Sequence, residues 1–275
     1  MTDNYMYPNI NLERATAVKS FIFDPNATSD EDGTVFSDWQ SMLGNISSIP
    51  GIKEIIIPGT VGSSIPTVIP PGNYDMTDIV LTGDNAFSAI EINDAVFENL
   101  QSISQLSVFV GQTAANSVPS FQISGGSAYV LTLDRVILAA SPLATAPMFR
   151  VSGVSGALIS PVNSTFASAG VPVFDVLDTS AVTLNQPAGA GAGNNYGGGP
   201  GSAAFFSVAV GASFTITGFS AGDVYFASNQ LPGVATVTFA SDYEPAVLAD
   251  WSGIQPLSIK NALDRIAAAI GPIPP

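Results

Sequence analysis

The chemistry open to this chain of 275 residues is limited first by the two residue types that it lacks. It contains no His and no Cys. Imidazole bases, thiolate nucleophiles and the usual zinc or iron ligands are therefore excluded. Carboxylates, Lys, Arg, Tyr, Ser and Thr remain. Carbohydrate-active proteins work with these groups in two ways. Some use a pair of carboxylates, and others use a basic residue beside carboxylates that bind calcium.

One candidate set of chemical groups occupies the middle position of a repeated apolar, polar, apolar pattern. In chain order its members are Glu91, Gln122, Arg150, Asp175 and Ser207. If neighbouring repeats stack, Arg150 and Asp175 face each other. We expect a surface ion pair worth at most about 1 kcal/mol rather than a catalytic pair. The only other carboxylate near Asp175 is Asp178, at the following corner.

The densest acidic run is Asp30-Glu31-Asp32, with Asp24 and Asp38 nearby. Several carboxylate oxygens could bind Ca²⁺. However, no Gly stands at the sixth position counted from Asp24, as a helix–loop–helix calcium site requires. We expect a solvated turn with, at most, an incidental cation, and we predict no metal site and no cofactor.

Aromatic residues gather near the end of the chain and could form a sugar-stacking face. They are Tyr225, Phe226, Phe239, Tyr243 and Trp251. Aromatic side chains also provide large apolar area for packing. We favour packing that seals the last part of the core.

Charge and hydropathy exclude several classes of partner. The 22 acidic and 7 basic residues give a formal net charge of −15, and no basic residue lies between Val151 and Ile259. Nucleic-acid binding and binding to anionic membranes are therefore disfavoured. No apolar run reaches the roughly 18 residues of a spanning helix, and the polar start is unlike a signal peptide. We expect a soluble protein without a secretory signal.

The surface is expected to be largely uncharged. Charged residues make up 11% of the chain, against roughly 25% in ordinary soluble domains, and the mean hydropathy is +0.36. Such a composition suits a stacked sheet structure with small polar residues outside, or a protein whose surface is covered in an assembly.

A repeated segment dominates the middle of the chain. The segments are AIEIND from Ala89, FQISGGSAYVLTL from Phe121, FRVSGVSGALIS from Phe149, FDVLDTSAVTL from Phe174 and FSVAVGASFTI from Phe206. They return at intervals of about 25 to 32 residues, which is typical of one coil of a β-solenoid. We predict that Phe121, Phe149, Phe174 and Phe206 stack at the sheet spacing of about 4.8 Å. An antiparallel sandwich remains an alternative.

Two short helices are expected, one near each end. Val35, Phe36, Trp39, Met42, Leu43 and Ile46 have helical spacing, with Thr34 as N-cap. After Pro256, Ser258 could cap a second helix whose apolar stripe we predict to be an assembly interface. The interface residues are Ile259, Leu263, Ile266 and Ile270. About a dozen residues are marginal as a free helix, so this one must dock on the rod or on another subunit.

These elements define three regions. We assign residues 1–50 to an N-terminal arm and capping helix, 51–245 to the solenoid, and 246–275 to a C-terminal helical attachment segment. Residues 185–204 are rich in Gly and Ala and are expected to form a loop. A strand rather than a helix follows their glycines, so they do not form a phosphate-binding loop.

The start of the chain resembles a known family. Asp32-Gly33-Thr34, the helix through Trp39, the strand ending at Pro58 and the turn Pro71-Gly72-Asn73-Tyr74 look like the beginning of pectate-lyase-like right-handed parallel β-helices. That resemblance implies an all-β, right-handed, single-stranded parallel β-helix whose short helix plugs the N-terminal end. Many such proteins are phage tail spikes, tail fibres or other virion proteins. The last segment, Trp251–Pro275, is similar to helical segments that end many phage structural proteins.

The resemblance and the composition together suggest a role in a virus particle. We expect a non-enzymatic phage structural protein, and among virion roles a capsid decoration or cement protein. It would be made in the host cytoplasm and would bind the major capsid protein, or other virion proteins, on the outer capsid surface through its ends, as a homotrimer. The alternative is a tail spike that binds or cleaves host polysaccharide, which would be indicated by a groove with two or three carboxylates within about 10 Å. A bacterial surface adhesin is a third possibility, against which the polar start argues.

Overall fold

The computed structural model describes residues 18–28, 33–62, 65–185, 194–196, 206–217, 224–225 and 236–240, the last two segments and residues 195–196 by their backbone alone. These residues form mostly parallel β-sheet with one short helix. The expected all-β class is confirmed at this level.

The described strands form three sheets. The ten-stranded sheet contains, in spatial order, β2 (Val35–Phe36), β1 (Lys19–Phe23), β3 (Lys53–Ile57), β6 (Ile79–Gly83), β9 (Ser102–Ser104), β12 (Tyr129–Asp134), β15 (Ala157–Val162), β18 (Ala181–Asn185), β21 (Ser213–Thr217) and β23 (Thr236–Ala240). The seven-stranded sheet contains β22 (Val224–Tyr225), β19 (Asn195–Tyr196), β16 (Thr165–Ser168), β13 (Ile137–Ala140), β10 (Ser107–Val110), β7 (Ala89–Ile92) and β4 (Thr67–Ile69). The six-stranded sheet contains β20 (Phe206–Val208), β17 (Phe174–Val176), β14 (Phe149–Val154), β11 (Phe121–Gly126), β8 (Ala95–Glu98) and β5 (Gly72–Asp75).

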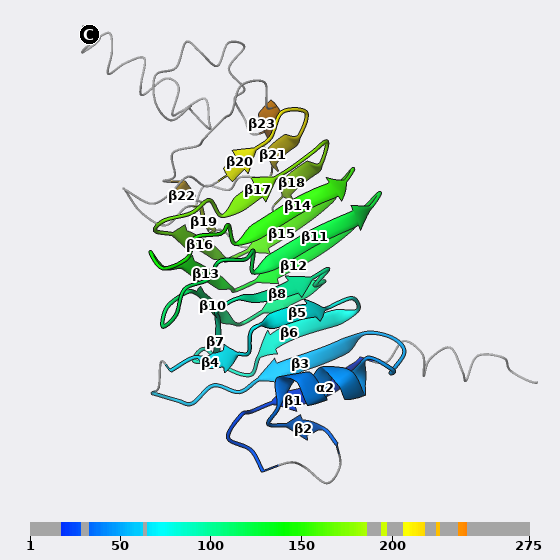
Figure 1. The fold of residues 1–275 in the computed structure, drawn as a ribbon, viewed down its shortest axis with the longest axis vertical. Coiled ribbons are helices and arrows are strands. Elements are labelled where there is room, and N and C mark those ends of the chain that lie inside the picture. Colours follow the sequence, from blue (N-terminus) through cyan, green and yellow to red (C-terminus); the bar gives the residue numbers. More distant parts are fainter. Residues whose placement is uncertain are drawn as a thin grey trace, which may run out of the picture.

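The chain visits the three sheets in rotation. From β5 to β18, consecutive strands lie in different sheets, and each strand pairs in parallel with the strand three places on, as β8 does with β11. Figure 1 shows the resulting stack of strands along the long axis of the molecule. Parallel strands need long connections, and here the strands of the other two sheets provide them. The arrangement is compatible with a parallel solenoid.

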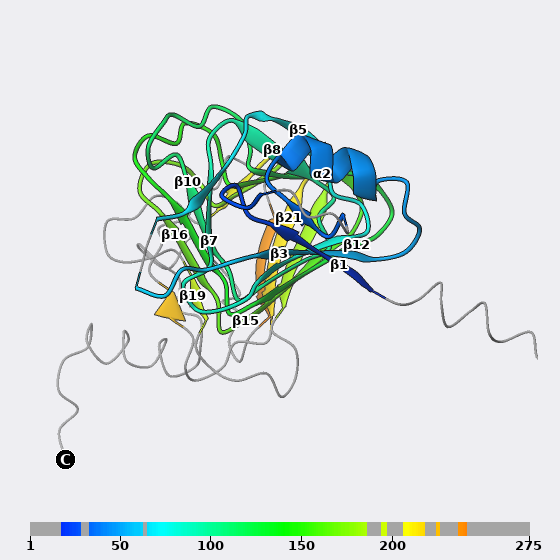
Figure 2. The same cartoon turned by 90° about the horizontal axis from the view of Figure 1, so that it is seen from below.

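Burial alternates along strands of all three sheets, such as β3, β10 and β17, which places one face of each sheet in a shared interior. Figure 2, viewed along the stack, shows the strands of the three sheets around that interior. The buried residues form one cluster that runs from Phe21 to Ile216. The core is therefore continuous across successive rungs, where a rung means one passage of the chain through the three sheets.

The four phenylalanines of the repeated segment lie in one column of this core. Phe121 pairs in register with Phe149, Phe149 with Phe174, and Phe174 with Phe206. All four are buried, and the ring centroids of the first two pairs are 4.8 Å apart. Full burial of one such side chain contributes roughly 1.5–3 kcal/mol.

The N-terminal helix begins later than the spacing predicts. Helix α2 spans Trp39–Ile46, and the Asp38 carboxylate accepts a hydrogen bond of 2.7 Å from the Ser41 backbone N–H. The prediction of Thr34 as N-cap is therefore wrong. Val35 and Phe36 belong instead to strand β2, where they pair with β1. β-branched and aromatic residues suit a strand whose partner is available, and helical spacing alone cannot exclude that partner.

Helix α2 packs against the N-terminal end of the core. Trp39, Met42 and Ile46 are its buried residues. The indole ring of Trp39 contacts Phe23, Tyr74 and Phe97, with centroid distances of 5.0, 6.0 and 5.7 Å. Figure 2 shows α2 beside β5 and β8.

Several predictions fall outside the described residues. These are the C-terminal helix with Ile259, Leu263, Ile266 and Ile270, the acidic run Asp30-Glu31-Asp32, most of the loop 185–204, and the side chains of Tyr225, Phe226, Phe239, Tyr243 and Trp251. They stay predictions.

Candidate functional site

The outward column of the six-stranded sheet contains the predicted ion pair. Arg150 and Asp175 are in register on β14 and β17, and the guanidinium Nη2 and Nε atoms each lie 3.3 Å from Asp175 Oδ2. The side chains are 37% and 18% exposed, so solvent weakens the attraction. The predicted surface pair is confirmed, and a contribution of at most about 1 kcal/mol suits its exposure.

Glu91 does not belong to that column, and this element of the sequence prediction is wrong. It lies on β7 in the seven-stranded sheet, in register with Val68 and Phe109. The residue that precedes Gln122 in the column is Glu98 of β8, beside Phe97. Ser207 follows Asp175 as predicted. A search for Phe followed by a polar residue would have found Phe97-Glu98, whereas alternation of apolar residues alone could not separate the sheets.

Glu91 is instead a buried anchor. Its Oε1 accepts hydrogen bonds from Thr113 N at 2.6 Å, Thr113 Oγ1 at 2.7 Å and Asn93 Nδ2 at 2.9 Å, and the residue is 1% exposed. Burial acts to raise the pKa of Glu91, but the hydrogen bonds from Thr113 and Asn93 together hold it below its ordinary value. The carboxylate thus ties the loop after β10 to the sheet.

A groove opens where the rungs change in length. Strands β8 and β9 have 4 and 3 residues, whereas β11, β12, β14 and β15 have 6 each. The β11–β12 corner therefore extends beyond the rungs below it. Asp78 and Asn99 close the tighter corners of those lower rungs with φ of 60° and 59°, a conformation that Asp and Asn tolerate well.

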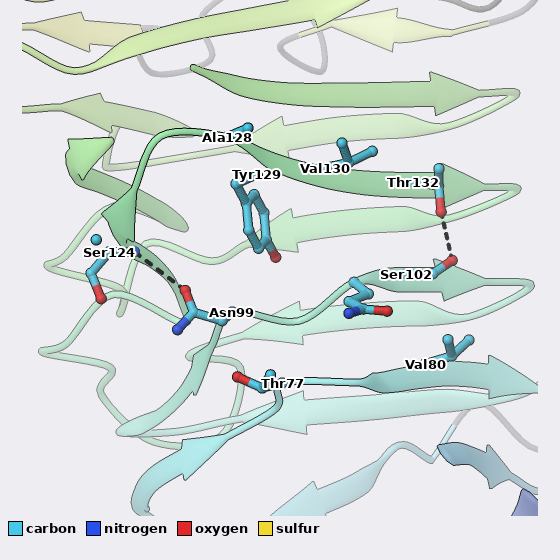
Figure 3. A pocket seen from close by; sticks show the side chains of 11 residues that line it. Thr77, Val80, Asn99, Ser102, Ser124, Ala128, Tyr129, Val130 and Thr132 are labelled. Atoms are coloured by element: carbon cyan, nitrogen blue, oxygen red, sulfur yellow. Dashed lines mark hydrogen bonds between the residues drawn. The ribbon is translucent and has the colours of Figure 1, made fainter. Parts of the chain in front are cut away.

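The groove has a volume of about 650 Å³ and is lined from three successive rungs. Figure 3 shows its walls and floor. The lining residues are Thr77, Val80, Asn99, Gln101, Ser102, Ser124, Gly125, Ala128, Tyr129, Val130 and Thr132. None of these residues has a side chain that is charged at neutral pH, and Gly125 has no side chain.

Hydrogen bonds fix the polar groups of the groove. Thr132 Oγ1 donates to Ser102 Oγ at 2.8 Å, and Gln101 Nε2 donates to Asp78 Oδ1 at 3.0 Å. The Tyr129 hydroxyl donates to the Leu100 carbonyl, and burial raises the pKa of this phenol. The hydroxyl is therefore a protonated donor at physiological pH. This arrangement suits recognition of an uncharged polar ligand.

The described residues hold neither a metal-binding cluster nor a membrane-spanning helix. Among them, no three acidic side chains cluster in a way that could bind a metal ion, and no helix has the length and apolar character needed to cross a bilayer. Asp24 and Asp38, the described neighbours of the acidic run, accept hydrogen bonds from the backbone of Asn26 and Ser41.

Comparison with known proteins gave no match. Neither the protein-family models, nor the curated proteins, nor the solved structures contain a chain similar to this one at a significant level.

Proposed function

We propose that the chain is a non-enzymatic structural protein of a phage particle, built as a right-handed, single-stranded parallel β-helix. The observation that carries the proposal is the continuous in-register core, which joins the described rungs into a single stack. The right hand is supported by the strong preference of parallel strand connections for that hand. The phage origin is supported by the resemblance of the chain ends.

The outer faces fit a building block better than a catalyst. In the outer column of the six-stranded sheet, Arg150 and Asp175 form an ion pair, and the buried Glu91 of the seven-stranded sheet anchors a loop. Asp94 Oδ1 likewise accepts hydrogen bonds from Ser117 N at 2.6 Å and Ser117 Oγ at 2.9 Å. These are structural uses of carboxylates, because each joins one rung or loop to the next.

Within the particle we propose a decoration role on the outer capsid surface. The formal net charge of −15 suits a position away from packaged DNA. The partners would be the major capsid protein or other virion proteins, and copies of this chain in a trimer. A contact of roughly 800 Å² per partner would be sufficient for specific attachment.

Labelling the protein in intact particles and imaging them by electron microscopy tests this role. The decoration role predicts copies spread over the capsid shell. Labels confined to the tail tip would overturn it and would support the spike alternative.

A substitution in the predicted C-terminal helix tests the attachment segment. Leu263→Asp places a charge in the apolar stripe and is expected to reduce incorporation into particles at least tenfold. The matched control is Asp264→Asn, which alters the polar face of the same helix and should incorporate normally. The circular dichroism of both variants should keep the β signal of the parent. Normal incorporation of Leu263→Asp would contradict the docking role.

A further inference from the structure

We propose that the groove between the β8–β9 and β11–β12 corners is a binding site for a neutral oligosaccharide. This inference depends on the geometry of the groove and not on the virion role, so the two can fail separately.

The shape of the groove suits a short linear ligand. Its lining comes from three rungs, represented by Val80 on β6, Ser102 on β9 and Thr132 on β12, which are in register. Successive strands lie about 4.8 Å apart, so the floor spans about 10 Å along the stack. The extended corner that carries Ser124 and Ala128 forms one wall (Figure 3).

The side chains offer the mixture of groups that a sugar requires. Asn99, Gln101, Ser102, Ser124 and Thr132 supply neutral donors and acceptors. A second set provides apolar surface for the C–H faces of a sugar ring, namely Val80, Ala128, Tyr129 and Val130. A ligand rich in both hydroxyl groups and C–H faces can use both sets.

Several of these polar groups are held in place and keep capacity for a ligand. Asn99 Oδ1 accepts a hydrogen bond from Ser124 N at 3.4 Å, and Gln101 Nε2 is bound to Asp78. Within the described stretches of the chain, nothing pairs with Asn99 Nδ2 or Gln101 Oε1. The first is a donor and the second an acceptor. Prior orientation of both groups lowers the entropic cost of binding.

Electrostatics favour an uncharged ligand over an acidic one. No lining side chain is cationic, so none can pair with a carboxylate or a sulfate. The net charge of −15 also repels polyanions at a distance. The site therefore selects neutral glycans.

The test measures binding of the labelled full chain to a printed array that carries neutral and acidic oligosaccharides. The blocking variant is Val130→Arg, which puts a long charged side chain into the groove. Its matched control is Ile137→Arg on β13. Both positions are exposed β-branched residues on strands, 52% and 45% exposed, but Ile137 does not line the groove. Asn99→Gly removes the amide while keeping a residue that accepts positive φ.

The parent and Ile137→Arg should bind at least one neutral oligosaccharide on the array. Val130→Arg and Asn99→Gly should bind it at least tenfold more weakly, with unchanged circular dichroism and thermal unfolding. The proposal is overturned if the parent binds no neutral glycan, if it binds only acidic ones, or if Val130→Arg and Ile137→Arg bind equally. Particle attachment of the same variants is scored separately, and it should be normal for all of them.

Discussion

At the scale of single residues, a buried carboxylate is the most informative feature. Glu91 accepts three hydrogen bonds from two residues, one of them 22 positions further along the chain. Hydrogen bonds to an ionised group are stronger than neutral ones, and a buried charge without them would be costly. The side chain therefore contributes to the stability of the rung through its charge.

Glu91→Gln should lower the free energy of unfolding at neutral pH by about 2 kcal/mol, because a neutral amide replaces the carboxylate whose charge strengthens these hydrogen bonds. Urea denaturation measures the change. Glu98→Gln, in the outward column, is the control and should change stability by less than about 0.5 kcal/mol. Equal effects of the two substitutions would show that the buried network is not stabilising.

The same network predicts a pH dependence. The pKa of Glu91 is lowered in the folded protein from an ordinary value of 4.5. Its stabilising contribution is therefore fully present above that value and is lost as the pH falls through the lowered pKa. Glu91→Gln should lack this component of the acid destabilisation in denaturation curves recorded from neutral pH downward. An acid profile identical to that of the parent would contradict the assignment.

Sequence reasoning could find residues that repeat and missed those that do not. The repeat places Phe149 and Phe174 at the same position of successive rungs. The residues that follow them, Arg150 and Asp175, are therefore predicted to meet. Thr113 carries no such signal, since it lies in the loop after β10, outside the repeated segments. Asp78 and Asn99 are residue types that favour left-handed corners, but Gln105 and Arg135 adopt the same conformation without a local signal.

At the scale of elements, Trp39 is the largest of the three buried side chains through which helix α2 packs on the core. Trp39 is fully buried and contacts three aromatic rings. Its Nε1 donor is buried without a partner among the described residues. The ring volume, rather than a hydrogen bond, therefore stabilises the N-terminal end.

Trp39→Ala should lower the free energy of unfolding by about 3–5 kcal/mol, because a large cavity opens beneath the helix. Trp39→Phe should cost clearly less, about 1–2 kcal/mol, since it keeps a ring and removes a donor that has no described partner. Chemical denaturation followed by circular dichroism measures both. If Trp39→Phe is as damaging as Trp39→Ala, the account of the helix is wrong.

The sequence predicts an element correctly where its residue pattern fits only one kind of structure. The strands that begin at Phe121, Phe149, Phe174 and Phe206 are observed at those residues. The prediction for the segment from Ala89 is wrong because strands of all three sheets alternate apolar and polar residues, so alternation does not identify a sheet. Helical spacing places Val35 and Phe36 in the helix, whereas their pairing with Ile22 and Phe23 of β1 gives no local signal in the sequence.

At the scale of the whole molecule, the core is a column in which each layer contacts the next. Stacked repeats of this kind are stabilised by their own packing and by the interface to each neighbour. Substitutions in adjacent layers should therefore be coupled, whereas substitutions at distant layers should not.

A double-mutant cycle tests this coupling. Phe149→Leu and Phe174→Leu, whose parent rings are 4.8 Å apart, should deviate from additivity by at least about 0.5 kcal/mol. Phe149→Leu combined with Phe23→Leu, at the N-terminal end of the core, is the control and should be additive within about 0.5 kcal/mol. Denaturant unfolding of the single and double variants supplies the energies. Additivity in both pairs would indicate energetically independent layers.

Because the rungs differ in strand length, the outer surface can change shape while the buried core stays the same. At the outer tip of the β11–β12 corner, an added Cβ on Gly125 or Gly126 would meet no atom within 4 Å. Insertions or deletions at such a tip disturb few contacts. Adding or removing residues there would change how far the β11–β12 corner extends, without repacking the core layers. Related chains could thus acquire different surface contours on an unchanged scaffold.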